Sequence, residues 1–266
     1  MRQITIKDIA KELGISPSTV SRALKDHPDI SAETKKAVTE LAEKLNYTPN
    51  SIALSLRQSK TFTIGVVIPE IIHFFFSTVI SGIEDIAYDA GYSVIVSQSN
   101  ESFEREVINA KALFNNRVDG MLISHSRETN EYNHFKSIFD RGMPMVFFDR
   151  VTDSIDCSKV IVDDFAGSFK AVEHLIELGY KRIAHLSGPT GLSISKDRFD
   201  GYKAALEKHN LPFDESLVIR ENASEDEAVS KTLTQKLLSM PNPPDAMFAM
   251  NDIAALGAMM GAKEMG

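Results

Sequence analysis

The segment ISPSTVSRAL, residues 15–24, concentrates side chains that can bind nucleic acid. Its polar members are Ser16, Ser18, Thr19, Ser21 and Arg22. Serine and threonine are weak helix formers because their hydroxyls compete for backbone hydrogen bonds. Their number in this helical segment therefore indicates a role other than helix formation. On an exposed helix, small hydroxyls can approach phosphates and base edges closely, and Arg22 can give a guanine two hydrogen bonds. The pattern favours contact with DNA; the alternative is a small helical cap with a solvated polar face.

Three short helices are expected to position this segment. Thr5 and Asp8 have the spacing of a capping box, and Gly14 can end the first helix. Ser16 can cap the second helix, with Pro17 at its first position. The inward-facing apolar positions are Val20, Ala23 and Leu24 in the second helix and, in a third helix capped by Ser31, Ala37, Val38, Leu41 and Leu45. Three such helices around a tight glycine turn predict a helix-turn-helix unit.

A run of longer motifs follows the same order along the chain. They are TIKDIAKELGISPSTVSRAL, ISAETKKAVTELAEKLNYTPNSIALSLR and TIGVVIP. With these motifs the chain resembles the LacI family of bacterial transcription repressors, and the resemblance continues through the remaining residues. It implies a helix-turn-helix head, a hinge helix, and an effector domain that looks like a two-lobed periplasmic sugar-binding protein. It also implies a homodimer or a larger assembly.

The resemblance implies a set of contacts to double-stranded DNA. They fall on Thr5, Ser16, Pro17, Ser18, Thr19, Ser21, Arg22, Asn50, Ala53 and Leu56. Those that would hold phosphates are Ser16, Thr19, Ser21 and Asn50, and those that would face bases are Pro17, Ser18 and Arg22. Leu56, with Ala53 beside it on the hinge helix, would enter the minor groove at a central CG step, because apolar wedges kink pyrimidine–purine steps most easily. Without DNA so short a helix would be largely unfolded, and the alternative is an ordinary interdomain linker.

From residue 63 onward, apolar runs alternate with amphipathic segments. The expected strands are Ile64–Ile68, Ser93–Ser97, Gly120–Ser124, Met145–Phe148, Val160–Val162, Ile183–Ser187 and Ala246–Ala249. This alternation predicts parallel, doubly wound α/β sheets. Because the order restarts near residue 160, we expect two halves, with a ligand bound between them at the carboxyl ends of strands. The expected parts are a head (1–49), a hinge and linker (50–61), an N-terminal lobe (62–158) and an incomplete, truncated C-terminal lobe (159–266).

For the effector, the resemblance implies a cleft lined by an aromatic plate and polar side chains. The implied residues are Phe75, Asp149, Arg150, Arg198, Asn251 and Asp252. Such a set suits a sugar or a sugar phosphate, whose hydroxyls need paired donors and acceptors around an apolar face. Structural alternatives stay open: a core position for Phe75, an interlobe ion pair for Arg150, and a helix cap for Asp252. A purine effector ranks second, because purine-binding relatives place an aromatic where Arg150 stands.

Composition and charge narrow the classes of function. The 266 residues contain one cysteine, Cys157, and no apolar run long enough to cross a bilayer, and the N-terminus lacks the features of a signal peptide, so we expect a cytoplasmic protein. The net charge is −8, yet residues 1–60 hold 10 basic and 7 acidic side chains, which favours a polyanion as the partner of the head. We find no P-loop, dinucleotide fingerprint, nucleophile elbow or zinc motif, and expect neither catalysis nor a metal or cofactor.

The sequence therefore predicts a sequence-specific transcription regulator, a repressor of a carbohydrate-utilisation operon that binds a pseudo-palindromic operator. A small effector between the lobes would control it by ordering or fraying the hinge helices. The rival prediction is a small-molecule binding protein whose N-terminal helices serve as a dimerisation cap.

Overall fold

The structure, a computed structural model, describes residues 4–47, 60–72, 74–220 and 226–266. The chain divides into two compact units, Met1–Thr61 and Phe62–Gly266. Within the described ranges, no helix is both long and apolar enough to span a membrane.

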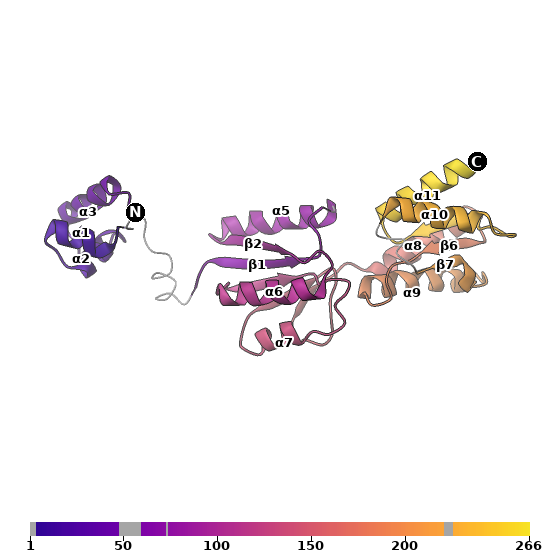
Figure 1. The fold of residues 1–266 in the computed structure, drawn as a ribbon, viewed down its shortest axis with the longest axis horizontal. Coiled ribbons are helices and arrows are strands. Elements are labelled where there is room, and N and C mark those ends of the chain that lie inside the picture. The colour runs from indigo at the N-terminus through magenta and orange to yellow at the C-terminus, as the bar shows by residue number, and fades with distance from the viewer. Residues whose placement is uncertain (1–3, 48–59, 73, 221–225) are drawn as a thin grey trace. The chain divides into compact units, whose positions relative to one another are not determined.

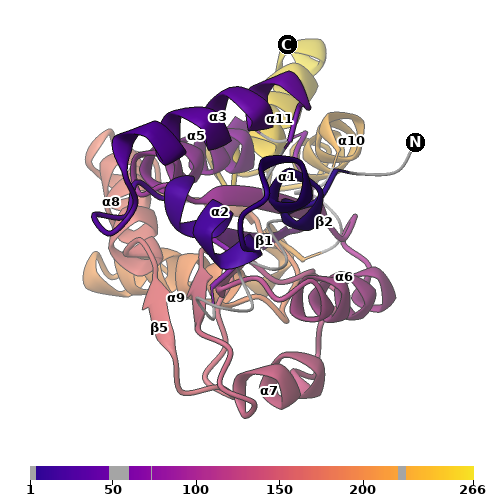
Figure 2. The same ribbon diagram turned by 90° about the vertical axis from the view of Figure 1, so that its left-hand side faces the viewer.

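Within residues 4–47, the first unit forms the helices α1 (Ile6–Leu13), α2 (Pro17–Ala23) and α3 (Ala32–Lys44), which pack on one another (Figure 2). Gly14, with φ at +64°, ends α1 and makes the turn into α2, a conformation that glycine adopts at little cost. The buried core is formed by Ile9, Ala10, Val20, Ala23, Val38, Leu41 and Ala42. The helix-turn-helix prediction is confirmed.

The helix starts are capped as the sequence predicts. The Asp8 carboxylate accepts hydrogen bonds from the Thr5 backbone N–H at 2.8 Å and from the Thr5 hydroxyl at 2.6 Å. The Ser16 hydroxyl oxygen accepts from the Thr19 N–H at 3.1 Å, and Ser31 caps α3 in the same way. These bonds satisfy amides that have no partner within the helix, which fixes where α1, α2 and α3 begin.

The second unit begins with a parallel five-stranded sheet in the order β2-β1-β3-β4-β5. Its strands are β1 (Thr63–Ile68), β2 (Ser93–Gln98), β3 (Gly120–Ile123), β4 (Met145–Phe148) and β5 (Ser158–Val160). Its helices are α5 (Phe74–Asp89), α6 (Phe103–Asn115) and α7 (Asn133–Phe139). Val66 and Ile68 pack against α5 on one face, whereas Val67 packs against α6 and α7 on the other (Figure 1). A strand buried on both faces explains the unbroken apolar run in β1.

The strand predicted at Val160–Val162 lies in a different place from the one expected. We expected it to open the second half of the effector domain, but Ser158–Val160 pairs with Val146–Phe148 and forms the edge of the first sheet. Strand pairing is set by distant parts of the chain, so the local pattern could not assign this strand to a sheet. The predicted lobe boundary at 158/159 therefore falls within β5.

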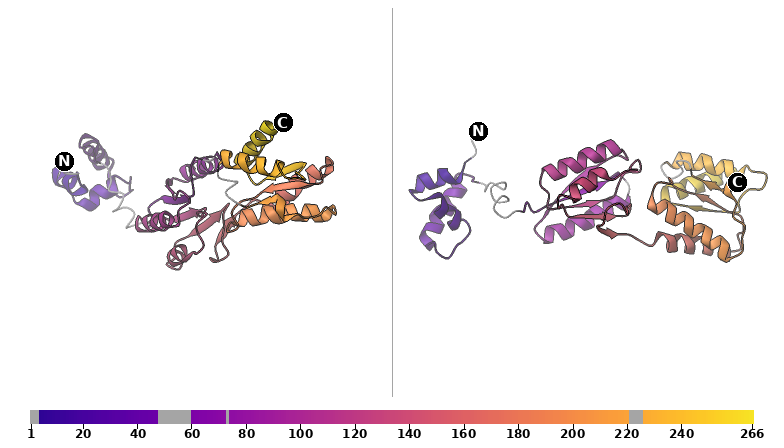
Figure 3. Two further views of the ribbon diagram at one scale, coloured as in Figure 1. Left: turned by 45° about the vertical axis from the view of Figure 1, so that its right-hand side comes forward. Right: turned by 90° about the horizontal axis from the view of Figure 1, so that it is seen from below.

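The rest of the second unit is a three-stranded parallel sheet in the order β7-β6-β8. Its strands are β6 (Ile183–Leu186), β7 (Val218–Ile219) and β8 (Ala246–Ala249), with a short 3-10 helix, η1 (Glu215–Leu217), before β7. Its helices are α8 (Asp164–Glu177), α9 (Ser193–Lys208), α10 (Glu227–Leu238) and α11 (Asp252–Met265). Ile183 packs with α8 and α9 while Ala184 packs with α10 and α11, so this sheet is covered on both faces (Figure 3). The doubly wound arrangement is confirmed.

Gly201 tests the close packing of α8 against α9. A Cβ at this position would overlap the Phe165 carbonyl oxygen and lie 3.0 Å from the Phe169 nitrogen, both of them backbone atoms that cannot move aside easily. We expect Gly201→Ala to lower the free energy of unfolding by about 1–3 kcal/mol, as overpacking does, although alanine forms helix better than glycine. Urea unfolding measures this. The matched control is Gly167→Ala in α8, where the added methyl meets nothing within 4 Å; an equal effect of both substitutions would contradict the steric explanation.

Candidate nucleic-acid interface and ligand site

The outer face of α2 carries the predicted DNA-contacting side chains. Val20 and Ala23 are buried, which turns Pro17, Ser18 and Arg22 toward solvent. The Ser16 hydroxyl lies 2.6 Å from the Ser18 hydroxyl and 2.9 Å from the Thr19 hydroxyl. Thr19 and Ser21 are half-buried at the edge of this face, and Thr5 lies at the start of α1 with its hydroxyl bonded to Asp8. Small donors and one long guanidinium thus share one exposed surface, a composition that suits phosphates and base edges.

Arg22 is the longest donor on this surface, and its side chain is 58% exposed. Its Nη1 atom lies 3.9 Å from the Asp29 carboxylate, which belongs to the loop before α3. Sequence reasoning missed Asp29, because a contact between a helix and a loop seven residues later leaves no periodic signal. The other predicted DNA contacts, Asn50, Ala53 and Leu56, lie outside the described residues.

At the carboxyl end of β4, Asp149 and Arg150 occupy different environments. Asp149 has φ at +59°, and the Ser124 hydroxyl donates to its carboxylate at 3.4 Å. Burial raises the pKa of Asp149, against the opposing charges of Arg150 and Arg198. The Arg150 guanidinium forms two hydrogen bonds with Glu101, at 2.8 and 2.9 Å. Arg150 therefore does form an ion pair, but not the interlobe pair considered above, because Glu101 lies in the loop after β2 of the same sheet.

Glu101 is held as an anion by this pair. Burial alone would raise its pKa, but the hydrogen bonds and charge of Arg150, with the Arg127 backbone N–H, lower the pKa below its usual range. A paired carboxylate and guanidinium are close to neutral together, so they present hydrogen-bonding groups without an isolated charge.

Arg198 lies in a second ion pair, with Asp164. Its Nε donates to the Asp164 carboxylate at 2.7 Å, and its Nη1 donates to the Met250 carbonyl at 2.5 Å. Asp163, the residue before Asp164, caps α8 and accepts from the Ala166 N–H at 2.8 Å. Only one of the acids is needed for the cap, and the other, Asp164, fixes the arginine.

The remaining predicted ligand residues are found on helix starts. Asn251 caps α11, accepting from the Ala254 N–H at 2.9 Å, so the capping role considered for Asp252 belongs to its neighbour. Asp252 is the exposed first residue of α11. Phe75, in the first turn of α5, is 49% exposed and meets the Phe76 ring edge-on, so the core alternative for Phe75 is wrong.

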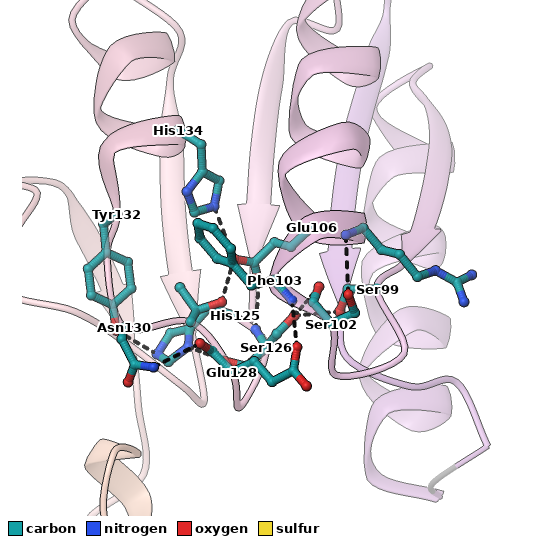
Figure 4. Close-up of polar contacts among 12 residues, drawn as sticks. Ser99, Ser102, Phe103, Glu106, His125, Ser126, Glu128, Asn130, Tyr132 and His134 are labelled. Carbon is teal, nitrogen blue, oxygen red and sulfur yellow. Dashed lines mark hydrogen bonds and ion pairs between the residues drawn. The ribbon is translucent and has the colours of Figure 1, made fainter.

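Glu106, which the sequence analysis missed, is a fully buried carboxylate in the second unit (Figure 4). Its carboxylate accepts hydrogen bonds from the Ser126 N–H at 2.5 Å and the Thr129 hydroxyl at 2.7 Å, and lies 3.0 Å from His134 Nε2. Burial would raise the pKa of Glu106, but these hydrogen bonds, that of His134 first, lower it below its usual range. A sequence signal did exist, because Glu106 stands one helical turn before the buried Ala110, on the apolar stripe of α6.

This network holds the loop that follows β3. In that loop His125 lies 2.9 Å from the Ser126 carbonyl through Nδ1 and 3.4 Å from the Tyr132 hydroxyl through Nε2 (Figure 4). The His125 carbonyl in turn accepts from Arg150 at 3.3 Å. Glu106 therefore fixes the backbone of this loop through Ser126, and the neighbouring His125 carbonyl helps to hold Arg150.

His185, on β6, is a buried histidine that makes stability depend on pH. Its ring is stacked near Phe199, Tyr202 and Phe248, and Nδ1 lies 3.0 Å from the Phe248 carbonyl. Burial lowers its pKa to about 4. Between about pH 6.5 and 4 the unfolded chain therefore binds a proton that the folded chain does not, and stability falls as the pH is lowered.

We expect His185→Phe to remove this dependence. For the single group the slope is at most about 1.4 kcal/mol per pH unit, and the whole effect at most about 3 kcal/mol. Urea unfolding at pH 7 and pH 4.5 measures it. His174→Phe, at an exposed position of α8, controls for the lost histidine; the same pH dependence in both variants would contradict the assignment.

Two family models match the chain. The model described as bacterial regulatory proteins, lacI family, matches residues 5–50. The model described as periplasmic binding proteins and sugar binding domain of LacI family matches residues 61–266. No group of histidine, cysteine and acidic side chains suited to a metal ion occurs among the described residues.

Relatives and solved structures agree with both models. Catabolite control protein A of Priestia megaterium is 33% identical over 264 residues, covering 99% of this chain and 78% of the relative. The ribose operon repressor of Halalkalibacterium halodurans is 34% identical over 262 residues, covering 98% and 76%. The lac repressor dimer bound to operator and the anti-inducer ONPF matches with a TM-score of 0.85 at 27% identity, covering 100% of this chain and 79% of that one. A CelR–cellobiose complex matches with a TM-score of 0.69 at 25% identity, covering 99% and 79%.

Proposed function

The chain belongs to the LacI family of bacterial regulatory proteins, and on that premise we propose that it represses a carbohydrate-utilisation operon in the cytoplasm. It is a DNA-binding regulator of transcription and not an enzyme. Two protomers would place their α2 helices in successive major grooves of a pseudo-palindromic operator. The observation that carries the proposal is the exposed hydroxyl-and-arginine face of α2 on a capped helix-turn-helix.

Fluorescence anisotropy over a salt series tests this proposal. The probe is a duplex that the protein selects from a pool of randomised pseudo-palindromes with a central CG step, and the control is a scrambled duplex. We expect binding to the selected duplex at least about 1,000-fold tighter than to the control, with a shallower dependence on salt. Selection of no sequence, with weak binding that salt abolishes equally on both duplexes, would overturn the proposal.

For the hinge, the proposal is that Leu56 enters the minor groove at the central step. Placing an apolar side chain between base pairs costs unstacking energy, and a bent duplex repays it with further contacts. We therefore expect Leu56→Ala to weaken binding to the selected duplex and to leave binding to the scrambled duplex unchanged.

For the effector, we propose an uncharged or phosphorylated sugar held by Asp149, Arg198 and Asn251, with Phe75 against its apolar face. The exposed ring of Phe75 and the half-buried Arg198–Asp164 pair support this assignment. Two of the similar proteins are named for sugars, the ribose operon repressor and the CelR–cellobiose complex.

A thermal-shift screen of pentoses, hexoses, cellobiose, sugar phosphates and purine bases identifies the effector class. We expect a sugar to raise Tm, and Arg198→Ala to abolish that increase. Lys196→Ala in the same helix, which removes only an exposed ion pair with Asp200, should keep it. Stabilisation by purines alone would overturn the sugar assignment.

A further inference from the structure

We propose that Asp29 is a specificity-determining residue of the DNA-binding surface: its carboxylate, beside Arg22, penalises contact with phosphates more than contact with a guanine edge. This inference rests on the proposed function, and it concerns a residue that is not among the DNA contacts considered above. Asp29 would act through Arg22 rather than by binding a base itself.

The loop between α2 and α3 fixes the position of Asp29. Its carboxylate lies 3.9 Å from Arg22 Nη1 and 3.4 Å from His27 Nδ1. The Asp29 N–H also donates to His27 Nδ1 at 3.3 Å, and the His27 N–H donates to the Arg22 carbonyl at 3.0 Å. On the other side, Ser31 starts α3 as its N-cap. The carboxylate is therefore tethered to the end of α2, on the side where the Arg22 guanidinium emerges.

A neighbouring acid shows what is unusual about Asp29. Asp26, in the same loop, lies 2.6 Å from Lys35 Nζ, and the hydrogen bond and charge of Lys35 lower the pKa of Asp26 below its usual range. Asp26 is thus balanced by a lysine of α3. Asp29 instead faces the arginine that would read DNA, and its side chain is 65% exposed.

An exposed ion pair of this length adds little to folding stability, so its effect is expected when DNA arrives. If Arg22 approached a phosphate, Asp29 would be brought near the same negative charge. A guanine edge is uncharged and offers two acceptors, O6 and N7, so Arg22 can exchange Asp29 for guanine with less repulsion. The carboxylate therefore lowers affinity for DNA in general and lowers it less where a guanine is in place.

The test compares Asp29→Asn with Asp26→Asn as a matched control, on the selected and the scrambled duplex over a salt series. For Asp29→Asn we expect binding to the scrambled duplex about 5- to 10-fold tighter, with a log–log salt slope steeper by up to about 1.8, as for one more effective phosphate contact in each protomer of the dimer. Binding to the selected duplex should change less than about 2-fold, so the specificity ratio falls. Asp26→Asn should resemble the wild type, and Asp29→Glu should restore the ratio.

Three results would overturn the inference. In the first, Asp29→Asn and Asp26→Asn have the same affinity for each duplex. In the others, Asp29→Asn lowers affinity for the selected duplex alone, or for both duplexes together. Far-UV circular dichroism of each variant separates the last result from unfolding of the head, and Asp29→Glu then decides whether the charge matters. Failure of the proposed function looks different, because the wild-type protein would then select no sequence at all.

Discussion

Arg22→Ala is expected to cause the largest loss of operator affinity of any single change on the α2 face. A bidentate contact from arginine to guanine contributes about 1–3 kcal/mol of base discrimination. A homodimer on a pseudo-palindrome makes the contact twice, so the loss is about 2–6 kcal/mol for the complex. The head should stay folded, because Arg22 is exposed and its 3.9 Å pair with Asp29 is not part of the core.

Anisotropy measures this loss and its origin. The probes are the selected duplex, the scrambled duplex, and a series of duplexes in which single base pairs are changed symmetrically in both half-sites. Arg22→Ala should lose discrimination at one position of the half-site and tolerate any base there. Lys44→Ala, which removes a positive charge from the last turn of α3, should leave base preference intact. An equal loss on selected and scrambled duplexes would show that Arg22 binds a phosphate instead.

The head could be predicted from the sequence because its determinants are local. Each cap joins residues three apart, such as Thr5 with Asp8 and Ser16 with Thr19, and the Gly14 turn needs only a left-handed residue. The pair of Arg22 with Asp29 escaped prediction, because it depends on the path of a loop whose residues show no periodicity.

The sheets could be predicted in outline but not in their pairing. Apolar runs marked Met145–Phe148 and Ala246–Ala249 with the observed bounds. Val218–Ile219 was not predicted, because two residues are too short for a periodic signal, and Ser158–Val160 joined the first sheet instead of the second. Pairing between strands is a non-local property, and a strand's own pattern shows only that it is buried.

The ligand site was predicted as a set of residues but not as a set of contacts. Asp164 was not among the predicted site residues, yet it binds Arg198, a residue 34 positions away. Glu101 was not singled out, although its two carboxylate oxygens accept hydrogen bonds from Nη1 and Nη2 of Arg150. Ion pairs between separate loops follow from the fold, so the sequence can supply the charged groups without showing which ones meet.

Glu106→Ala is expected to cause the largest loss of stability in the second unit. The carboxylate is fully buried and accepts three hydrogen bonds, from Ser126, Thr129 and His134. Removing one member of a buried charged network leaves the other polar groups without partners and costs about 3–5 kcal/mol. Urea unfolding measures the difference from wild type, and Glu104→Ala, at an exposed position two residues earlier on the opposite side of α6, should change little.

The pH dependence of that loss distinguishes an ionised carboxylate from a merely well-packed side chain. Because the pKa of Glu106 is lowered in the folded chain, its ionisation stabilises the protein above the unfolded pKa of about 4.3, and this stabilisation is lost as the pH falls through the folded value. The gap between wild type and Glu106→Ala should therefore be widest near pH 7 and narrow in acid. A difference in unfolding free energy below about 1 kcal/mol at pH 7, or one that acid leaves unchanged, would contradict a charged network.

Hydrogen exchange should then show that the loop from Ser124 to Tyr132 opens more readily in Glu106→Ala than in wild type, because Ser126 and Thr129 of that loop donate hydrogen bonds to Glu106.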